Sequence, residues 1–176
     1  IMSSDWSSDV CSSDLGPSDP DQDNKADLPP EDDWTVHTEE GFGFSVGIPP
    51  EYGLKPLTEE DLAGLKPMPS VAMIIVRSEF LPDSPSPLVT PDLEIRVHAL
   101  GGSASLAEWL SANGFDEGWG DPEAFETDHV SGEILCLSTM IAPGCSYFVM
   151  GEGWVYQLIP ASLEGESIIG TFKLLS

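Results

Sequence analysis

GFGFSVGIPP (Gly41–Pro50) is the stretch in which the strand pattern of this chain is clearest. Large apolar residues occupy every second position: Phe42, Phe44, Val46 and Ile48. This alternation is typical of a β-strand with one face against a core. The residues between them, Gly43, Ser45 and Gly47, are small, so the second face is either solvated or packed closely by another element. The two prolines that follow end the strand, because proline has no backbone N–H for a β-ladder.

The segment SLAEWLSANGF (Ser105–Phe115) predicts the best-specified helix of the chain. Ser105 and Glu108 form a capping box, in which each side chain satisfies an exposed backbone N–H of the first turn. The apolar residues recur at helical spacing: Leu106, Trp109 and Leu110. Gly114 can adopt the left-handed conformation after the last turn, and Phe115 can then fold back on the helix in a Schellman closure. We expect this helix to cover a face of a sheet.

Two strands are expected before this helix. Val71–Val76 is a continuous apolar run flanked by prolines, which predicts a central strand. Asp92–Ala99 alternates, and its core-facing residues are Leu93, Ile95, Val97 and Ala99. The residues between them, Glu94, Arg96 and His98, are expected to face solvent. Two shorter elements complete this half of the chain: a strand at Trp34–Thr38 and a helix at Thr58–Leu65 that Thr58 caps.

The second half of the chain predicts strands joined by tight turns. The expected strands are Ile134–Ile141, Cys145–Met150 and Trp154–Pro160. Ala142–Gly144 and Gly151–Gly153 are the natural hairpin turns between them, because glycine and proline favour tight turns. Apolar residues at helical spacing in Ser162–Leu175 predict a closing helix, although Gly165 and Gly170 weaken it.

The order β-β-α-β-β-α-β-β-β-α, with hairpin turns, favours an α+β fold over a parallel doubly wound sheet. We predict a mostly antiparallel sheet of about six or seven strands, with helices packed on its faces. Residues 34–176 are long enough to form a single domain with its own core.

Three stretches of the chain resemble PsbP-like domains. GFGFSVGIPPEYGL (Gly41–Leu54) is similar to their aromatic-glycine-aromatic strand, SLAEWLSANGF to their capped helix, and SIIGTFKLL (Ser167–Leu175) to their closing segment. The resemblance covers nearly all of 34–176 and implies the same α+β fold. Such domains include an extrinsic photosystem II subunit and many small bacterial envelope lipoproteins. The resemblance therefore implies an extracytoplasmic domain, but not photosystem binding, for which the photosynthetic members use N-terminal segments of their own.

The beginning of the chain is interpreted separately. Trp6–Leu15, WSSDVCSSDL, is the translation of a DNA string that resembles a sequencing adapter, so residues 1–15 are read as a disordered artefact. Residues 16–33 are acidic and rich in proline, which predicts a disordered linker. An acidic linker ahead of a compact domain is the layout of a tethered envelope lipoprotein. A lipid anchor would then lie in the N-terminal region that the adapter replaces.

The acidic balance of the chain limits its partners. It has 31 Asp and Glu against six Lys and Arg, for a net charge of −25. Nucleic acids and anionic lipid surfaces are therefore excluded, because both require a basic footprint. A basic partner or divalent cations would be attracted. Because the apolar runs are all shorter than the roughly 18 residues of a membrane span, we expect no transmembrane segment in the chain as given.

Two acidic segments are candidates for calcium binding. In the first, carboxylates alternate at Asp19, Asp21 and Asp23, but Asn24 and Pro30 stand where an EF-hand loop needs glycine and glutamate. The second gathers its acidic residues around an aromatic one: Asp116, Glu117, Trp119, Asp121 and Glu123. Paired carboxylates beside an aromatic ring also serve glycoside hydrolysis, whereas a solvated loop is the simpler interpretation in so acidic a chain. The sequence leaves the metal open.

The candidate catalytic residues do not form a recognisable set. Gly43–Gly47 matches the G-x-S-x-G pattern of serine hydrolases, but that chemistry needs Ser45 on a turn from a strand into a helix. Here the motif lies inside a strand, so we interpret the match as accidental. None of His37, His98 and His129 has a second histidine or cysteine at metal-ligand spacing, so a zinc or copper site would have to join distant residues. We predict no cofactor, since phosphate-binding, dinucleotide-binding and CxxC motifs are all lacking.

The two cysteines outside the adapter-like segment are nine residues apart, at Cys136 and Cys145. With the hairpin turn at Ala142–Gly144, Cys136 would lie opposite Val149 or Met150 rather than opposite Cys145. We therefore predict two buried free thiols. A disulfide would require a different strand register or a bulge.

These observations favour a non-catalytic accessory or binding domain, tethered outside the cytoplasm, that engages a protein or an envelope component. No catalytic or cofactor-binding residue is assigned. The alternatives are a hydrolase whose site assembles only in three dimensions, and a calcium-stabilised acidic surface protein.

Overall fold

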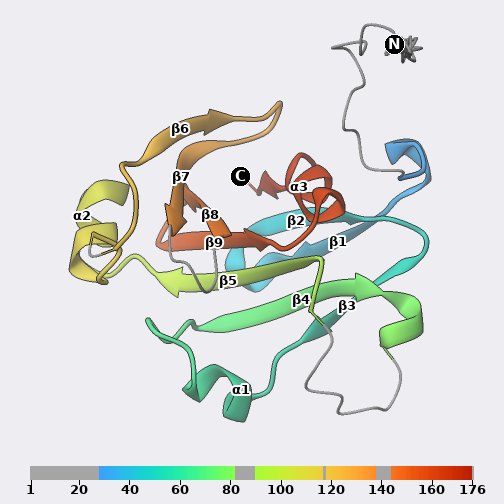
Figure 1. The fold of residues 1–176 in the computed structure, drawn as a ribbon, viewed down its shortest axis with the longest axis horizontal. Coiled ribbons are helices and arrows are strands. Elements are labelled where there is room, and N and C mark those ends of the chain that lie inside the picture. The colour runs from blue at the N-terminus through green and yellow to red at the C-terminus, as the bar shows by residue number, and fades with distance from the viewer. Residues whose placement is uncertain (1–27, 82–89, 117, 138–143, 176) are drawn as a thin grey trace, which may run out of the picture.

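The computed structural model describes residues 28–81, 90–116, 118–137 and 144–175 (Figure 1). The adapter-like residues 1–15 and the candidate calcium loop around Asp19–Asp23 lie outside the described residues. The described part begins within the predicted linker, where Leu28 packs against the core and Glu31–Asp33 forms the 3-10 helix η1. Within these ranges, every helix is too short or too polar to pass through a lipid bilayer.

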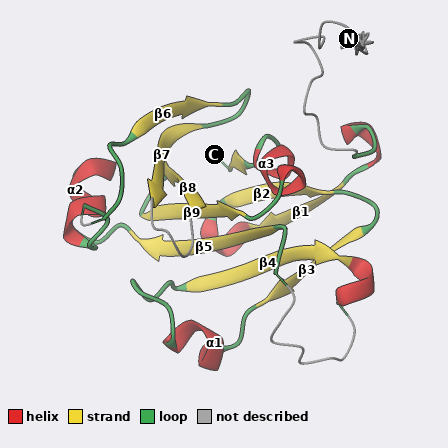
Figure 2. Cartoon of the chain, in the orientation of Figure 1, coloured by secondary structure: helices red, strands yellow, loops and turns green. Residues whose placement is uncertain are grey.

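The described residues form a seven-stranded sheet with the order β3-β4-β5-β9-β8-β7-β6 (Figure 2). All neighbouring strands in it are antiparallel. Its strands are β3 (Tyr52–Pro56), β4 (Val71–Arg77), β5 (Leu93–Ala99), β6 (Glu123–Glu126), β7 (Ser131–Leu137), β8 (Gly144–Met150) and β9 (Trp154–Pro160). The predicted α+β class and the antiparallel sheet are confirmed.

A smaller three-stranded sheet has the order β1-β2-β10. Its strands are β1 (Thr35–Glu39), β2 (Phe44–Ile48) and β10 (Lys173–Leu174). The α-helices of the described residues are α1 (Glu59–Ala63), α2 (Leu106–Ala112) and α3 (Leu163–Ile169). Two further 3-10 helices are η2 (Glu40–Phe42) and η3 (Ser78–Phe80). The first hairpin, β1–β2, therefore belongs to a second sheet, which the sequence did not predict.

The second face of β2 is packed rather than solvated. A Cβ placed on Gly47 would come within 3.0 Å of both Thr171 Oγ1 and Trp34 Cε3. The backbone N–H of Gly47 also donates to Thr171 Oγ1 at 2.8 Å. The small residues of this strand are thus explained by close packing, the second of the two alternatives that the sequence left open.

The main core lies where the two sheets and α3 meet. α3 contacts β9, β5 and β2. The core contains fully buried side chains from all three parts: Phe44 and Val46 of β2, Ile95 of β5, Tyr156 and Leu158 of β9, and Ile168 and Phe172 from α3 and the residues after it. Burial of these large side chains is the dominant stabilising contribution to such a fold.

The helix α2 ends as the sequence predicts, but the predicted capping box at its start is only half formed. Ser105 Oγ accepts from the Glu108 N–H at 3.2 Å, whereas the Glu108 carboxylate accepts from Ala104 N–H instead of the N–H of Ser105. At the other end Gly114 has φ +82°, and Phe115 N–H donates to Leu110 O at 3.0 Å, which completes the Schellman closure. A second core cluster lies beneath α2, which is at the left-hand end of the larger sheet in Figure 1.

The closing helix is shorter than predicted. Ser162 caps α3 by accepting from Gly165 N–H at 3.1 Å, and the helix ends at Ile169. The residues after it turn back into β10, which pairs with β2. Gly165 is required within the helix, because a Cβ there would overlap the carbonyl oxygen of Asp92. The predicted helix Ser162–Leu175 therefore merged one helix and one strand.

Candidate functional site

The principal candidate site is a hollow of about 260 Å³ between the η2–β2 turn, the β8–β9 turn and the end of β10. We call it the aromatic hollow. The residues that matter for its chemistry are Glu40, Phe42, Glu152, Trp154, Tyr156 and Leu175. They come from segments that are far apart in the sequence and that the two sheets bring together. It is an open depression in the surface, not an enclosed cavity.

Three aromatic rings form the apolar part of the hollow. The rings of Phe42 and Trp154 meet edge to face, with centroids 4.9 Å apart. Tyr156 lies deeper, and its hydroxyl donates to the backbone carbonyl of Phe42 at 2.6 Å. Burial raises the pKa of Tyr156, so the phenol stays protonated and keeps this hydrogen bond. The aromatic surface is therefore held in a fixed arrangement.

Glycines keep the hollow open. A Cβ on Gly151 would lie 2.9 Å from Tyr156 Cε2 and 3.5 Å from Leu174 Cδ1, so it would push against the Tyr156 ring that lines the hollow. Gly43 has φ +69°, a conformation that few other residues adopt, and it carries the chain from η2 into β2. Replacing either glycine by a larger residue would fill or distort the hollow.

Two carboxylates, Glu40 and Glu152, stand at the rim of the hollow, and both residues are exposed. Within the described ranges neither of them forms an ion pair. Lysine and arginine are also missing from the residues that line the hollow. The hollow therefore combines aromatic surface with net negative charge, which suits a cationic ligand and disfavours an anionic one.

His98 is buried, and the prediction that it faces solvent is wrong. Its residue is only 3 % exposed, because Trp109 of α2 lies over it with ring centroids 5.2 Å apart. The alternation of β5 did place His98 on the opposite face from the main core. That face is covered by α2 at this point, so both faces of the strand are buried there.

A chain of polar side chains continues from His98 across the sheet. His98 Nε2 lies 3.3 Å from Gln157 Oε1, and the amide nitrogen of Gln157 donates to Ser146 Oγ at 3.1 Å. His98 Nδ1 has no hydrogen-bond partner among the described residues. Burial lowers the pKa of His98 to about 4. The hydrogen bond with Gln157 raises this pKa, but its effect is smaller than that of burial. The histidine is neutral at neutral pH and serves as a packed core residue under Trp109.

The G-x-S-x-G motif lies inside β2, as the sequence predicts, and Ser45 is buried. Ser45 nevertheless lines a second, smaller hollow of about 120 Å³ together with His129 and Lys173. Lys173 is its cross-strand partner on β10. The hydrogen bonds found within the described residues do not include one between Ser45 and His129. The third histidine, His37, lies on β1 with Nε2 3.8 Å from Glu39 Oε2.

The candidate metal ligands do not converge in the part of the chain that the structure describes. There, no three His, Cys, Asp or Glu side chains lie close enough together to hold a metal ion. Of the acidic loop, Glu117 lies outside the described residues, and Glu123 is the exposed first residue of β6.

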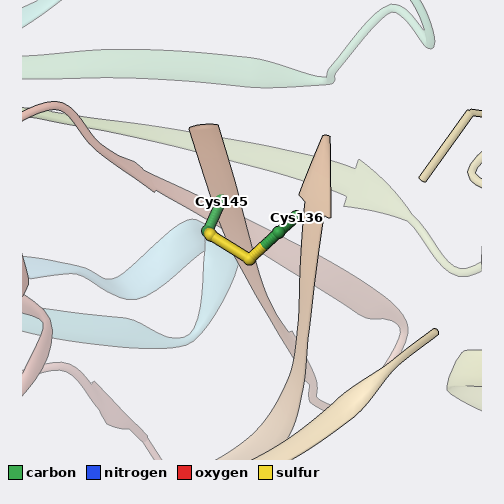
Figure 3. The surroundings of a disulfide bond; sticks show 2 residues. All are labelled: Cys136 and Cys145. Carbon is green, nitrogen blue, oxygen red and sulfur yellow. A yellow bond between two sulfur atoms is a disulfide. The ribbon is translucent and has the colours of Figure 1, made fainter. Parts of the chain in front are cut away.

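Cys136 and Cys145 form a disulfide bond across the β7–β8 hairpin (Figure 3). The prediction of two buried free thiols is therefore wrong. The two cysteines are direct cross-strand partners, because β7 ends at Leu137, which pairs with Gly144. Residues 138–143, which include most of the predicted hairpin turn, lie outside the described residues. Cys136 is exposed and Cys145 is half-buried, so the bond lies near the surface.

Comparison with known proteins adds to the geometry. No family model matches the chain, and no curated protein matches it. Among solved structures, the solution structure of the cyanobacterial PsbP of Synechocystis sp. PCC 6803 is similar, with a TM-score of 0.49 and 10 % sequence identity. The match covers 85 % of this chain and 96 % of that chain. The likeness concerns the fold and assigns no site.

The sequence did not reveal the aromatic hollow. Phe42 was recognised as part of an alternating strand, and Gly151–Gly153 as a hairpin turn. Neither pattern shows that the two turns lie side by side, since that depends on how the small sheet packs on the large one. The available signal was an aromatic residue, Trp154, directly after a glycine-containing turn.

Proposed function

We propose that this chain is a non-catalytic binding domain that works outside the cytoplasm, as an accessory to a protein or to an envelope component. The aromatic hollow is the observation that carries the proposal. It offers aromatic surface and two carboxylates that form no ion pair with the described residues, and its hydroxyl group, on Tyr156, is already engaged by the backbone of Phe42. Such a lining favours recognition of a ligand over attack on one.

The disulfide supports the proposed location. Structural disulfides form and persist in oxidising compartments and are rare in the cytoplasm of most organisms. The Cys136–Cys145 bond is near the surface, where a reducing cytoplasm would reach it. A tether through the acidic segment 16–33, with a lipid anchor ahead of it, would complete the lipoprotein layout that the sequence resemblance implies.

The binding role is tested by NMR on the full chain with a set of small cationic, neutral and anionic compounds. We expect the compounds that bind to perturb the Trp154 indole N–H and the amides of Gly43 and Gly151. Binding that perturbs only residues remote from these, or no binding by any compound, contradicts the proposed function.

The location is tested on protein isolated from the cells that produce it, with free thiols blocked during lysis. Mass spectrometry of the peptides that contain Cys136 and Cys145 should find both cysteines unblocked until a reductant is added. Blocked thiols in the freshly isolated protein would place it in a reducing compartment.

A hydrolase is the second candidate, because Ser45, His129 and Lys173 line one hollow. A fluorophosphonate probe labels activated serines and so tests it directly. Under our proposal the wild-type chain stays unlabelled. Labelling that is lost in Ser45→Ala would instead favour the hydrolase.

A further inference from the structure

We infer that the aromatic hollow receives the side chain of a lysine or arginine from a basic polypeptide segment. The inference rests on the proposed binding function and names its ligand. At about 260 Å³ the hollow is smaller than the roughly 300–1,000 Å³ of pockets that enclose drug-sized ligands. Its size therefore suits one long side chain rather than a whole metabolite.

The aromatic rings favour a cation in the hollow. Trp154 is only half-buried, and its indole is the aromatic group that attracts cations most strongly. Phe42 packs against its edge, and Tyr156 lies beneath. A lysine or arginine side chain also brings an apolar stem, which can pack along these rings while the charged end remains near the rim.

The rim supplies the opposite charge. Glu40 and Glu152 are exposed, lie on the two turns that border the hollow, and have no ion-pair partner among the described residues. The whole chain carries a net charge of −25, which adds a long-range attraction for a basic segment. An ammonium or guanidinium group in the hollow would meet both carboxylates.

The hollow is already formed without its ligand. Gly151 N–H donates to Trp154 O at 3.0 Å, and Leu175 N–H donates to Gly43 O at 2.9 Å. Together with the Tyr156–Phe42 hydrogen bond, these contacts fix the turns that carry the rim. A preformed site costs less conformational entropy when it binds.

The surroundings favour a polypeptide as the source of the cation. Leu175 at the edge of the hollow is 41 % exposed. This side chain offers apolar contact to the residues beside a docked lysine or arginine. A small free amine would leave it in water.

The experiment titrates the full chain with the peptide acetyl-Gly-Lys-Gly-amide, followed by NMR at the Trp154 indole N–H. The matched ligand is the same peptide with its lysine side chain acetylated, which keeps the length and removes the charge. We expect the lysine peptide to bind and the acetylated peptide to bind at least about fivefold more weakly.

The matched protein variants remove two carboxylates each. The double variant Glu40→Gln, Glu152→Gln should bind the lysine peptide about fivefold or more weakly. The control double variant is Glu60→Gln, Glu126→Gln, whose two residues are exposed and lie outside the hollow. It should change the affinity by less than about twofold. Trp154→Leu, which keeps an apolar side chain, should weaken binding by about threefold or more.

Each other outcome has a defined meaning. Equal binding of the two peptides at Trp154 overturns the cation inference and leaves the binding function in place. Binding of neither peptide, nor of any compound in the earlier set, overturns both. If both double variants lost the same affinity for the lysine peptide, the attraction would come from the net charge of the chain alone. That result would overturn the hollow as the binding site. Choline binding more tightly than the lysine peptide would overturn the polypeptide as the occupant.

Discussion

Burial under Trp109 holds the pKa of His98 at about 4, against 6.5 for an exposed histidine. Between these two values the unfolded chain binds a proton that the folded chain does not. The free energy of unfolding therefore falls as the pH drops from 6.5 to 4, and this group contributes nothing to pH dependence above that range. The loss amounts to about 2–3 kcal/mol.

This prediction is measured by urea unfolding of the wild type and of His98→Gln at pH 7 and pH 4.5. The carboxylates titrate in both proteins, so the difference between the two proteins isolates the histidine. We expect the variant to gain about 2 kcal/mol relative to the wild type on going to pH 4.5. A difference that does not change with pH would show that His98 is protonated as easily in the fold as in the unfolded chain.

Single residues also show what the sequence could and could not predict. The alternation in β5 correctly placed Leu93, Ile95 and Val97 in the core. It said nothing about the other face, where α2 covers His98. Likewise, the small residues of β2 showed that close packing was one alternative, but not that Thr171 and Trp34 supply it. A period of two defines faces, and only the tertiary structure decides what covers each face.

At the level of elements, the end of α2 allows a test of backbone conformation alone. A Cβ on Gly114 or on Gly102 would meet no atom within 4 Å, but only Gly114 has a positive φ, at +82°. Gly114→Ala should therefore destabilise the protein by about 1 kcal/mol, and Gly102→Ala should be neutral or slightly stabilising. Thermal or urea unfolding of the two variants measures the difference. Equal effects of the two substitutions would contradict a role for the left-handed residue in the Schellman closure.

The β7–β8 hairpin gives a second test at this scale. The disulfide closes a short loop, with a sequence separation of nine, and should stabilise the fold by about 2–3 kcal/mol. The double variant Cys136→Ala, Cys145→Ala should be less stable by this free energy of unfolding. It should unfold at the same urea concentration with or without a reductant. The wild type should fall to the same midpoint only when it is reduced. A wild type that is indifferent to reductant would show that the bond contributes nothing to stability.

The register of this hairpin also explains why the cysteines were misassigned. The apolar run suggested a strand that continues to Ile141, whereas β7 ends at Leu137 and pairs with Gly144. Moving the last paired residue of the strand moves every partner, so Cys136 faces Cys145 instead of Val149. Hairpin register depends on loop length, which a run of apolar residues that continues past Leu137 in the sequence conceals from the pattern.

For the whole molecule, local pattern predicted the class of the fold but not its division into two sheets. The alternation of Phe42–Ile48 predicts a strand without naming the sheet to which that strand belongs. The aromatic hollow depends on this division, because Phe42 lies in η2, between the strands β1 and β2 of the smaller sheet, whereas Trp154 belongs to the larger sheet. The candidate site was therefore beyond the reach of the sequence pattern, although the alternation around Phe42 and the turn at Gly151–Gly153 were each visible.

The net charge of −25 leads to the last prediction. Among the described residues the lysines and arginines form only two ion pairs, at Arg77–Glu164 and Arg96–Glu94, so repulsion between carboxylates dominates. Salt screens this repulsion, which is stronger in the compact state than in the unfolded chain. Raising NaCl from about 10 mM to about 500 mM should therefore increase the free energy of unfolding in urea, by on the order of 1 kcal/mol. A variant with the exposed Glu59, Glu60, Glu123 and Glu126 changed to Gln should gain less from the same salt. If the wild type were destabilised by NaCl, or if the variant gained as much as the wild type, self-repulsion would not govern the stability of this acidic fold.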